Sequence, residues 1–267
     1  MTYETILYDV SERIATITLN RPDVLNAISP LMARELKDAY AAAEADPNVW
    51  IIIVTAVGRA FCTGADVSDI PGTGKVVYEE EYLSTHEQWD APQEATPPFR
   101  TMTKPVLAAI QGLCAGAGMD LLTTADIVIA ADHVEFLDPH VSIGLVSARE
   151  AVRYSRALPI NVAMRLALMG KQERLSAQRL YDLGLITELV PVDDLPARAR
   201  EIAGMVNKNA PLAVRGTRMA IRKGLSLPVY EAELLAETYR ERVTRTEDAL
   251  EGPKAFVEKR APKWQCK

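Results

Sequence analysis

The sequence has few cysteines and no long apolar run, and both absences restrict what the protein can be. Its three cysteines, Cys62, Cys114 and Cys266, show no Cys-x-x-Cys or Cys/His spacing. An odd number at these positions predicts neither a disulfide framework nor a zinc site. No apolar stretch approaches the roughly 20 residues that cross a bilayer. Because the acidic N-terminus is unlike a secretory signal or a transit peptide, we expect a cytoplasmic protein with no membrane partner.

Positive charge is also in the minority. The 30 Lys and Arg are outnumbered by 36 Asp and Glu, which gives a formal net charge of −6. This balance is unfavourable for a nucleic-acid partner, but it allows a local basic patch for the phosphates of a small ligand. Aliphatic residues are abundant and spread along the chain. The length and composition therefore predict one large folded domain, or one domain with a helical appendage.

The most informative stretch runs from Lys104 to Asp132, KPVLAAIQGLCAGAGMDLLTTADIVIAAD. It predicts a buried strand (106–110), a turn rich in Gly and Ala (112–118), a short helix (119–125) and a second buried strand (127–130). Small residues let a turn bend sharply and let a ligand approach its backbone. The first N–H groups of the helix have no partner within it, so they can stabilise a thioester oxygen that becomes an enolate. The alternative is a corner that serves packing only.

The rest of the chain predicts an α/β core followed by helices. A hairpin near residues 5–19, a helix from Ser29 to about Ala45 and a strand over 50–56 are typical of a largely parallel sheet. The later elements are a strand over 134–138, helices over 150–158, 161–169 and 176–183, a strand over 187–190, and helices over 196–208, 211–223, 228–245 and 248–259. We divide the chain into a core (1–195) and a C-terminal helical region (196–267), whose apolar faces are suited to packing on a neighbouring subunit.

Three motifs occur in order: RPDVLNA (21–27), FCTGAD (61–66) and KPVLAAIQG…GAGMDLLTTADI (104–127). Together they resemble the crotonase, or enoyl-CoA hydratase/isomerase, superfamily, and the likeness extends to the C-terminal helix. The resemblance implies an α/β fold with a ββα-repeat spiral core and a C-terminal helical region. It also implies an acyl-CoA thioester substrate, as in fatty acid metabolism, and no tightly bound cofactor apart from the CoA of that substrate. The implied assembly is a homotrimer, or a hexamer built as a dimer of trimers.

The resemblance assigns an oxyanion hole to two backbone N–H groups. By match to the second and third motifs, these belong to Ala65 and Ala117. The donors are backbone groups, so the side chain has only to leave room for the carbonyl, and Ala does so at both positions. One such donor is typically worth a few kcal/mol of the reaction barrier.

The resemblance also implies where CoA binds. The backbone of Val24, Thr63 and Ala65 matches the positions that contact adenine in the family. Phe256 and Lys259, one helical turn apart, match C-terminal contacts to adenine and phosphate that a neighbouring subunit often supplies. For Lys259 there is a plain alternative, because a Lys near a helix C-terminus is what any solvated helix shows.

The acid/base positions depart from the family pattern. Hydratases of the family carry one Glu in the helix after the Gly-rich turn and another in a later Pro-Glu segment; these positions are Asp120 and His140 here. Asp is one methylene shorter than Glu, so its carboxylate lies roughly 1–1.5 Å further back. His can act as acid or base near neutral pH. Alternatively, Asp120 is present only because an acid in the first turn interacts favourably with the helix dipole, and His140 has a purely structural role.

Three reactions fit these residues. Hydration of a trans-2-enoyl-CoA, a lyase reaction, is predicted first, and double-bond isomerisation, which needs one acid/base group, second. The third is C–C hydrolysis as in the β-diketone hydrolases, which the segment also resembles. There His140, held by a carboxylate such as Asp138 or Glu150, would activate water. Because both family Glu residues are replaced, a non-catalytic acyl-CoA-binding scaffold is the alternative from another class.

Two further expectations concern residues outside this chemistry. Asp126 resembles the structural Asp of the family, so we expect no role for it in the reaction. The least regular segment, 67–100, supplies four side chains that either line an acyl pocket or pack a helix: Tyr78, Tyr82, His86 and Trp89.

Overall fold

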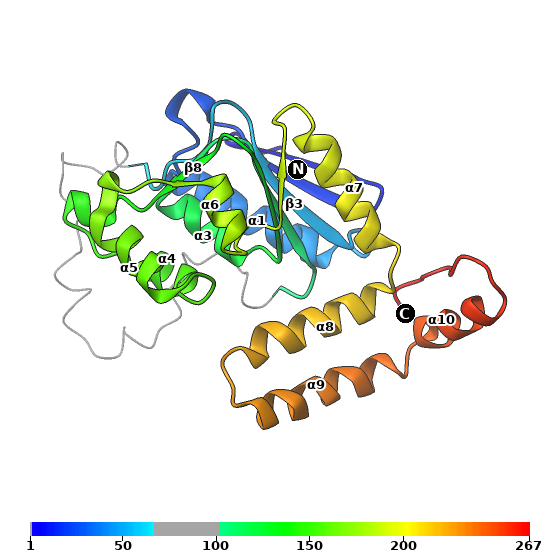
Figure 1. Cartoon of the computed structure of the whole chain (residues 1–267). Helices are drawn as coiled ribbons and strands as arrows, with labels where there is room; N and C mark the ends of the chain where they lie inside the picture. The colour runs from blue at the N-terminus through cyan, green and yellow to red at the C-terminus, as the bar shows by residue number, and fades with distance from the viewer. Residues whose placement is uncertain (1, 67–101) are drawn as a thin grey trace, which may run out of the picture.

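The larger of two sheets lies at the centre of the core (Figure 1). The structure, a computed structural model, describes residues 2–66 and 102–267. Six strands follow the spatial order β1-β2-β3-β5-β7-β10. They are β1 (Ile6–Ser11), β2 (Ile14–Leu19), β3 (Ile51–Ala56), β5 (Val106–Ile110), β7 (Ile127–Ala131) and β10 (Glu188–Val190). β1 and β2 pair antiparallel, and every later neighbour pairs parallel, as predicted for these apolar strands.

A second, smaller sheet lies beside the first and carries the candidate site. Its order is β4-β6-β8-β9, with β4 (Ala60–Cys62), β6 (Leu113–Ala115), β8 (Glu135–Leu137) and β9 (Leu175–Ser176). β4, β6 and β8 pair parallel, and β9 pairs antiparallel with β8. The strand pairs β3/β4, β5/β6 and β7/β8 each place one strand in each sheet. This arrangement confirms the spiral of ββα units that the resemblance implied.

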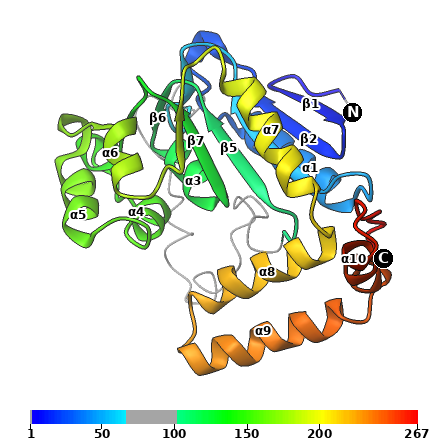
Figure 2. The ribbon, with the colours of Figure 1, turned by 45° about the vertical axis from the view of Figure 1, so that its right-hand side comes forward.

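Helices cover the sheets and continue beyond them (Figure 2). They are α1 (Pro30–Ala45), α3 (Ala117–Thr124), α4 (Arg149–Tyr154), α5 (Ile160–Met169), α6 (Ala177–Asp182), α7 (Leu195–Asn207), α8 (Pro211–Gly224), α9 (Val229–Val243) and α10 (Glu247–Val257). α1 begins as predicted, with the Ser29 hydroxyl accepting a hydrogen bond from the Met32 N–H at 3.2 Å and Pro30 in the first turn. α3 begins at Ala117, two residues earlier than the sequence predicted.

The two faces of the large sheet contribute to two apolar cores. Side chains alternate along β3, so that Ile51 and Ile53 pack toward α7, whose Leu195 and Ala199 are buried against them. Ile52, on the other face, belongs to the main core together with residues of α1 and α3. Met119, Leu121 and Leu122 of α3, the helix that begins with Ala117, are buried in this main core.

α8 and α9 lie side by side and extend away from the sheets in both views (Figures 1 and 2). Large apolar side chains are exposed along α9 and α10: Val229, Tyr230, Leu234, Leu250, Phe256 and Val257. The division at residue 195 and the packing of the helical region on a neighbouring subunit stay predictions. Among the described residues, no helix is both long and apolar enough to cross a bilayer.

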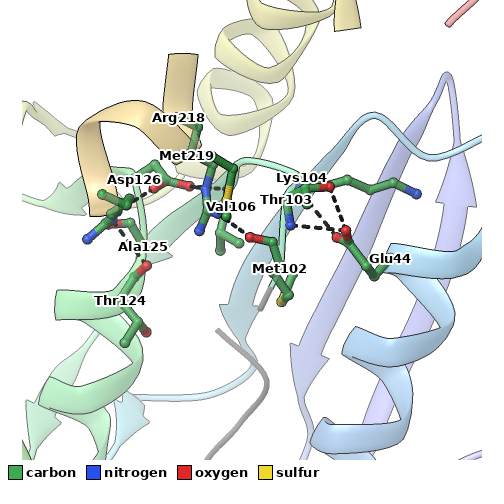
Figure 3. Close-up of polar contacts among 11 residues, drawn as sticks. Glu44, Met102, Thr103, Lys104, Val106, Thr124, Ala125, Asp126, Arg218 and Met219 are labelled. Carbon is green, nitrogen blue, oxygen red and sulfur yellow. Dashed lines mark hydrogen bonds and ion pairs between the residues drawn. The ribbon is translucent and has the colours of Figure 1, made fainter. Parts of the chain in front are cut away.

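A largely buried ion cluster connects α8 to the core (Figure 3). The carboxylate of Asp126 accepts hydrogen bonds from the Val106 N–H (2.8 Å) and from Nε of Arg218 (2.6 Å). Nε of Arg222 donates to its other oxygen at 2.8 Å. Arg218 is 8% exposed and also donates to the Met102 carbonyl. These contacts are those of a structural residue, which is the role that the sequence predicted for Asp126.

We expect Arg218→Met to lower the free energy of unfolding by about 2–3 kcal/mol, because it removes one partner of a buried carboxylate. Chemical denaturation measures the change. The matched control is Arg240→Met on α9, where Arg240 pairs with Glu237 at the surface and both side chains are more than half exposed. The control should change stability by less than about 0.5 kcal/mol. Equal losses in the two variants would show that the cluster adds no stability.

Candidate active site

The first two sequence motifs form one rigid unit. Nη1 of Arg21 donates to the Ala27 carbonyl at 2.6 Å and to Asp66 at 2.8 Å. The side-chain amide of Asn26 donates to the carbonyls of Val57 and Ala60, both at 2.8 Å. RPDVLNA is therefore fastened to the strand and loop of FCTGAD, and the position of Ala65 depends on both motifs.

A single bridge orients the Ala65 backbone. The Ile28 N–H donates to the Gly64 carbonyl (2.8 Å), and the Ile28 carbonyl accepts from the Asp66 N–H (3.0 Å). In a parallel bridge of this kind the residue between the two bonded neighbours directs its own N–H to the opposite side. Ala65 is exposed, and its N–H has no acceptor among the described residues. This donor is available to a ligand.

The second donor is at the start of α3. Gly116 caps the helix at φ 51°, in the region that favours glycine, and the N–H of Ala117 has no acceptor within the described part of the chain. A Cβ on Gly116 would be 3.3 Å from Cα of Gly64, and a Cβ on Gly64 would be 3.8 Å from the nitrogen of Ala117. The structure thus brings the loop bearing Ala65 directly against the turn bearing Ala117.

Glycine is also needed at position 118. A Cβ on Gly118 would meet the Cys62 carbonyl oxygen at 2.6 Å, closer than real Cβ contacts allow. The close approach of α3 to β4 therefore depends on this position. Cys62 and Cys114, which lie around it, are buried, and burial raises the pKa of the Cys62 thiol to about 12. They act here as small packing residues.

His140 lies next to the donor turn and is held by Asp138. A Cβ on Gly116 would be 3.8 Å from Cε1 of the His140 ring, whose side chain is 20% exposed. Nδ1 of His140 is 2.5 Å from Oδ1 of Asp138, a carboxylate with no exposed surface. An ionised carboxylate only accepts hydrogen bonds, so Nδ1 must be the protonated nitrogen. Nε2 is left to exchange a proton with a ligand.

The carboxylate that orients His140 is itself fixed. Oδ2 of Asp138 accepts hydrogen bonds from the hydroxyl of buried Tyr154 (2.8 Å) and from the hydroxyl of Ser147. Burial alone would raise the pKa of Asp138, but the hydrogen bonds from His140, Ser147 and Tyr154 lower it below its ordinary value. The hydrogen bond to Asp138 in turn raises the pKa of His140, against the effect of burial. His140 is an oriented base that is easily protonated.

Asp120 lies in the first turn of α3 and is bound by an arginine. Its carboxylate pairs with Nη1 of Arg153 on α4, and both side chains are largely buried. Burial raises the pKa of Asp120, the charge of Arg153 opposes this, and nearby Glu150 adds to the increase. Glu150, considered from the sequence as a partner for His140, is buried on α4, but the carboxylate in contact with His140 is Asp138.

The predicted CoA contacts divide into two groups. Val24 is 42% exposed, and Thr63, whose hydroxyl donates to the Leu25 carbonyl at 3.3 Å, lies next to it on the same unit as Ala65. Phe256 is 85% exposed on α10, which lies away from α3 in both views (Figures 1 and 2). Lys259 follows α10 at φ 53°. The structure thus joins Val24 and Thr63 to the donor site, and leaves Phe256 and Lys259 apart from it.

Four side chains that the sequence offered for an acyl pocket lie outside the described residues: Tyr78, Tyr82, His86 and Trp89. Within residues 2–66 and 102–267, no group of three or more His, Cys, Asp or Glu side chains could hold a metal ion. Sequence reasoning missed Ser147, Arg153 and Tyr154. The sequence did contain one signal for Tyr154: it is four residues after Glu150, a spacing that places both on the same face of a helix, and both are buried there.

Comparisons with known proteins identify the family of this chain. The profile of the family described as enoyl-CoA hydratase/isomerase matches residues 9–267. An enoyl-CoA hydratase/isomerase from Mycobacterium paratuberculosis, known from its crystal structure, is 65% identical over 100% of both chains, with a TM-score of 0.92. A probable enoyl-CoA hydratase of Mycobacterium tuberculosis is 31% identical over 99% of each chain. The (E)-benzylidenesuccinyl-CoA hydratase of Thauera aromatica is 30% identical over 96% of this chain and 97% of its own. The chain therefore belongs to the enoyl-CoA hydratase/isomerase, or crotonase, family.

Proposed function

We propose that this protein hydrates a trans-2-enoyl-CoA, with His140 in place of a catalytic Glu. The observation that carries the proposal is the position of His140, beside the Gly116 turn and fixed through Nδ1 by a buried carboxylate. A base must be held within hydrogen-bond reach of the proton that it takes, and this ring is held next to the predicted oxyanion donors.

The proposed reaction begins with the thioester carbonyl bound by the N–H groups of Ala65 and Ala117. Nε2 of His140 takes a proton from water while the water oxygen bonds to C3 of the enoyl group. The electron pair of the C2–C3 double bond moves toward C1, and the carbonyl oxygen becomes an enolate oxygen held by the two donors. Collapse of the enolate with a proton delivered to C2 gives the 3-hydroxyacyl-CoA.

Asp120 is the second proton-transfer group in this proposal. Its pKa is raised by burial, so it exchanges protons more readily near neutral pH than an exposed Asp does. Arg153 fixes the carboxylate in position. The shorter Asp side chain would thereby be compensated by a defined orientation, and a proton would pass between Asp120 and C2.

The same proposal places CoA along Val24, Thr63 and Ala65. Phe256 and Lys259 would serve a neighbouring copy, because α10 lies away from α3 within one chain (Figure 1). A homotrimer, or a dimer of trimers, supplies such a neighbour. No cofactor is proposed other than the CoA of the substrate, and a cytoplasmic location remains a prediction.

C–C hydrolysis of a β-diketone is a second candidate, and the pairing of His140 with Asp138 favours it. A carboxylate that holds imidazole in one tautomer is the arrangement used to activate a nucleophile in other hydrolases. Here Nε2 would take a proton from water, the water oxygen would bond to one carbonyl carbon, and the C–C bond would break to give an acid and an enolate. The enolate would again be held by Ala65 and Ala117.

One assay separates these functions. The purified protein is incubated with crotonyl-CoA, with a trans-3-enoyl-CoA and with a β-diketone, and the conjugated chromophore is followed. Hydration removes the absorbance of crotonyl-CoA, isomerisation generates it from the 3-enoyl thioester, and C–C hydrolysis removes the diketone absorbance. Binding of crotonyl-CoA without turnover of any substrate would overturn the enzyme proposal in favour of an acyl-CoA-binding scaffold.

We expect acetoacetyl-CoA at millimolar concentration to raise the Tm. A ligand at about 100 times its Kd stabilises the folded state by about 2.7 kcal/mol. For a chain of this size that is a rise of roughly 5–10 °C. Differential scanning fluorimetry measures the shift, with acetoacetate at the same concentration as the control. A shift that acetoacetate reproduces, or no shift at all, would count against the acyl-CoA assignment.

A further inference from the structure

A basic cavity of about 520 Å³ lies between α3, α4 and α8. Within the described part of the chain, no carboxylate residue lines this cavity. Its polar lining includes five cationic side chains: Arg153, Arg156, Arg218, Arg222 and Lys223. Apolar surface comes from Val152, Met219 and Leu225, and from the methylene stems of the cationic residues. In a chain with a formal net charge of −6, this is a strong local concentration of positive charge.

The cations of the basic cavity are only partly neutralised. Arg218 and Arg222 share the single carboxylate of Asp126, and Arg153 pairs with Asp120. Arg156 is exposed and has no carboxylate partner among the described residues. Lys223 has none there either, and its ammonium lies 5.8 Å from the centre of the Tyr239 ring. Among the described residues, the five cations that line the cavity are paired with only two carboxylates, which leaves an excess of positive charge. An anion that enters would neutralise part of this excess.

The basic cavity and the candidate active site share Arg153. Arg153 lines the cavity and also binds Asp120, in the helix whose first residue is the oxyanion donor Ala117. Thr123 and Thr124, at the other end of α3, also line the cavity. Seven residues separate Ala117 from Thr124, a span of roughly 10 Å along a helix. An acyl chain of medium length, with its thioester carbonyl at Ala117, spans this distance.

We propose that the basic cavity binds the free carboxylate of a dicarboxylic acyl group. The proposal rests on the proposed acyl-CoA function and narrows the substrate class to thioesters that carry a second, terminal carboxylate. Arg156 and Lys223 bind that carboxylate by charge-assisted hydrogen bonds, and the apolar part of the lining contacts the methylenes before it. The nucleotide of CoA lies at the other end of α3, with Val24 and Thr63, so its phosphates do not compete for the cavity.

The test compares two saturated ligands that differ only in the terminal group, so that no turnover is needed. Isothermal titration calorimetry gives the Kd of octanoyl-CoA and of suberyl-CoA, which has the same eight-carbon chain ending in a carboxylate. We expect suberyl-CoA to bind about tenfold tighter or more, the effect of one hydrogen-bonded ion pair. The double variant Arg156→Gln/Lys223→Gln should bind both ligands with the affinity that the wild type has for octanoyl-CoA. The control Arg179→Gln removes an exposed cation on α6 and should keep the preference.

The other outcomes overturn the proposal in distinguishable ways. If octanoyl-CoA binds and suberyl-CoA binds no tighter, the cavity does not recognise a carboxylate, and the proposed function is unaffected. If the double variant weakens both ligands equally, the two cations hold the CoA phosphates. If neither thioester binds to the wild type, the acyl-CoA function itself fails, and this inference fails with it.

Discussion

His140→Ala is expected to lower kcat by about 100- to 10,000-fold, the usual contribution of a positioned acid/base group. Water can still enter the site, but the base proposed to take its proton is missing. The Kd of a saturated acyl-CoA should stay nearly unchanged, because the imidazole serves the reacting carbons and not the nucleotide. Steady-state kinetics and calorimetry give both values. An unaltered kcat would return His140 to a structural role and leave the chemistry to Asp120.

The pH profile gives an independent readout of the same residue. His140 must be neutral at Nε2 to accept a proton, and its pKa is raised by the hydrogen bond to Asp138. The protonated, inactive form therefore persists to higher pH than for a free histidine. We expect kcat/KM to rise with pH through an apparent pKa above the ordinary histidine value of about 6.5. This limb should be missing from the residual activity of His140→Ala.

The conservative variant His140→Glu separates the two candidate reactions. It restores the residue type of the family's hydratases, and combination with Asp120→Glu restores both. If the protein is a hydratase, the single variant should keep hydration activity and the double variant should show it most clearly. If His140 is a base for C–C cleavage, the Glu variant should lose cleavage and gain no hydration.

The second large effect is expected from Ala117→Pro, which should lower kcat by about 100-fold or more by removing one oxyanion donor. Ala117 is the first residue of α3, a position at which Pro is well tolerated, so the fold should persist. Ala117→Gly is the matched control, because it changes the side chain but keeps the N–H. Circular dichroism verifies folding of both variants. A folded Pro variant with wild-type kcat would place the oxyanion donor elsewhere.

The large sheet and most helices could be predicted from the sequence because each contains its own signal. β3 and β5 are continuous apolar runs, and α1 has a Ser-Pro start that marks its first turn. In the small sheet, β8 was predicted, as a strand over 134–138, but β4 and β6 had no such signal. β4 and β6 have three residues each, and β6 lies within a Gly- and Ala-rich segment that by itself predicts a turn. These segments become strands only through pairing with neighbours distant in sequence.

The parts of the candidate site that lie close together in the sequence could be predicted better than those that lie far apart. Asp138 and His140 are two residues apart, and their association was one of the alternatives that the sequence left open. The contact of Asp120 with Arg153 spans 33 residues and depends on how α4 packs against α3. The two donor loops could be paired only through the resemblance to a family. Nothing in the local pattern of Ala65 or Ala117 shows that their loops meet.

The anchoring of Asp138 has a consequence for how such a site can change during evolution. The proposed enolate donors depend on backbone geometry set by the small sheet and α3, whereas the orientation of His140 depends on Ser147 and on Tyr154 of α4. Substitutions around α4 can therefore redirect the proton-transfer group without disturbing the donors. A lineage with this architecture can acquire a new reaction on the same thioester intermediate through a few changes in one helix, while the half of the site that binds the intermediate stays under separate selection.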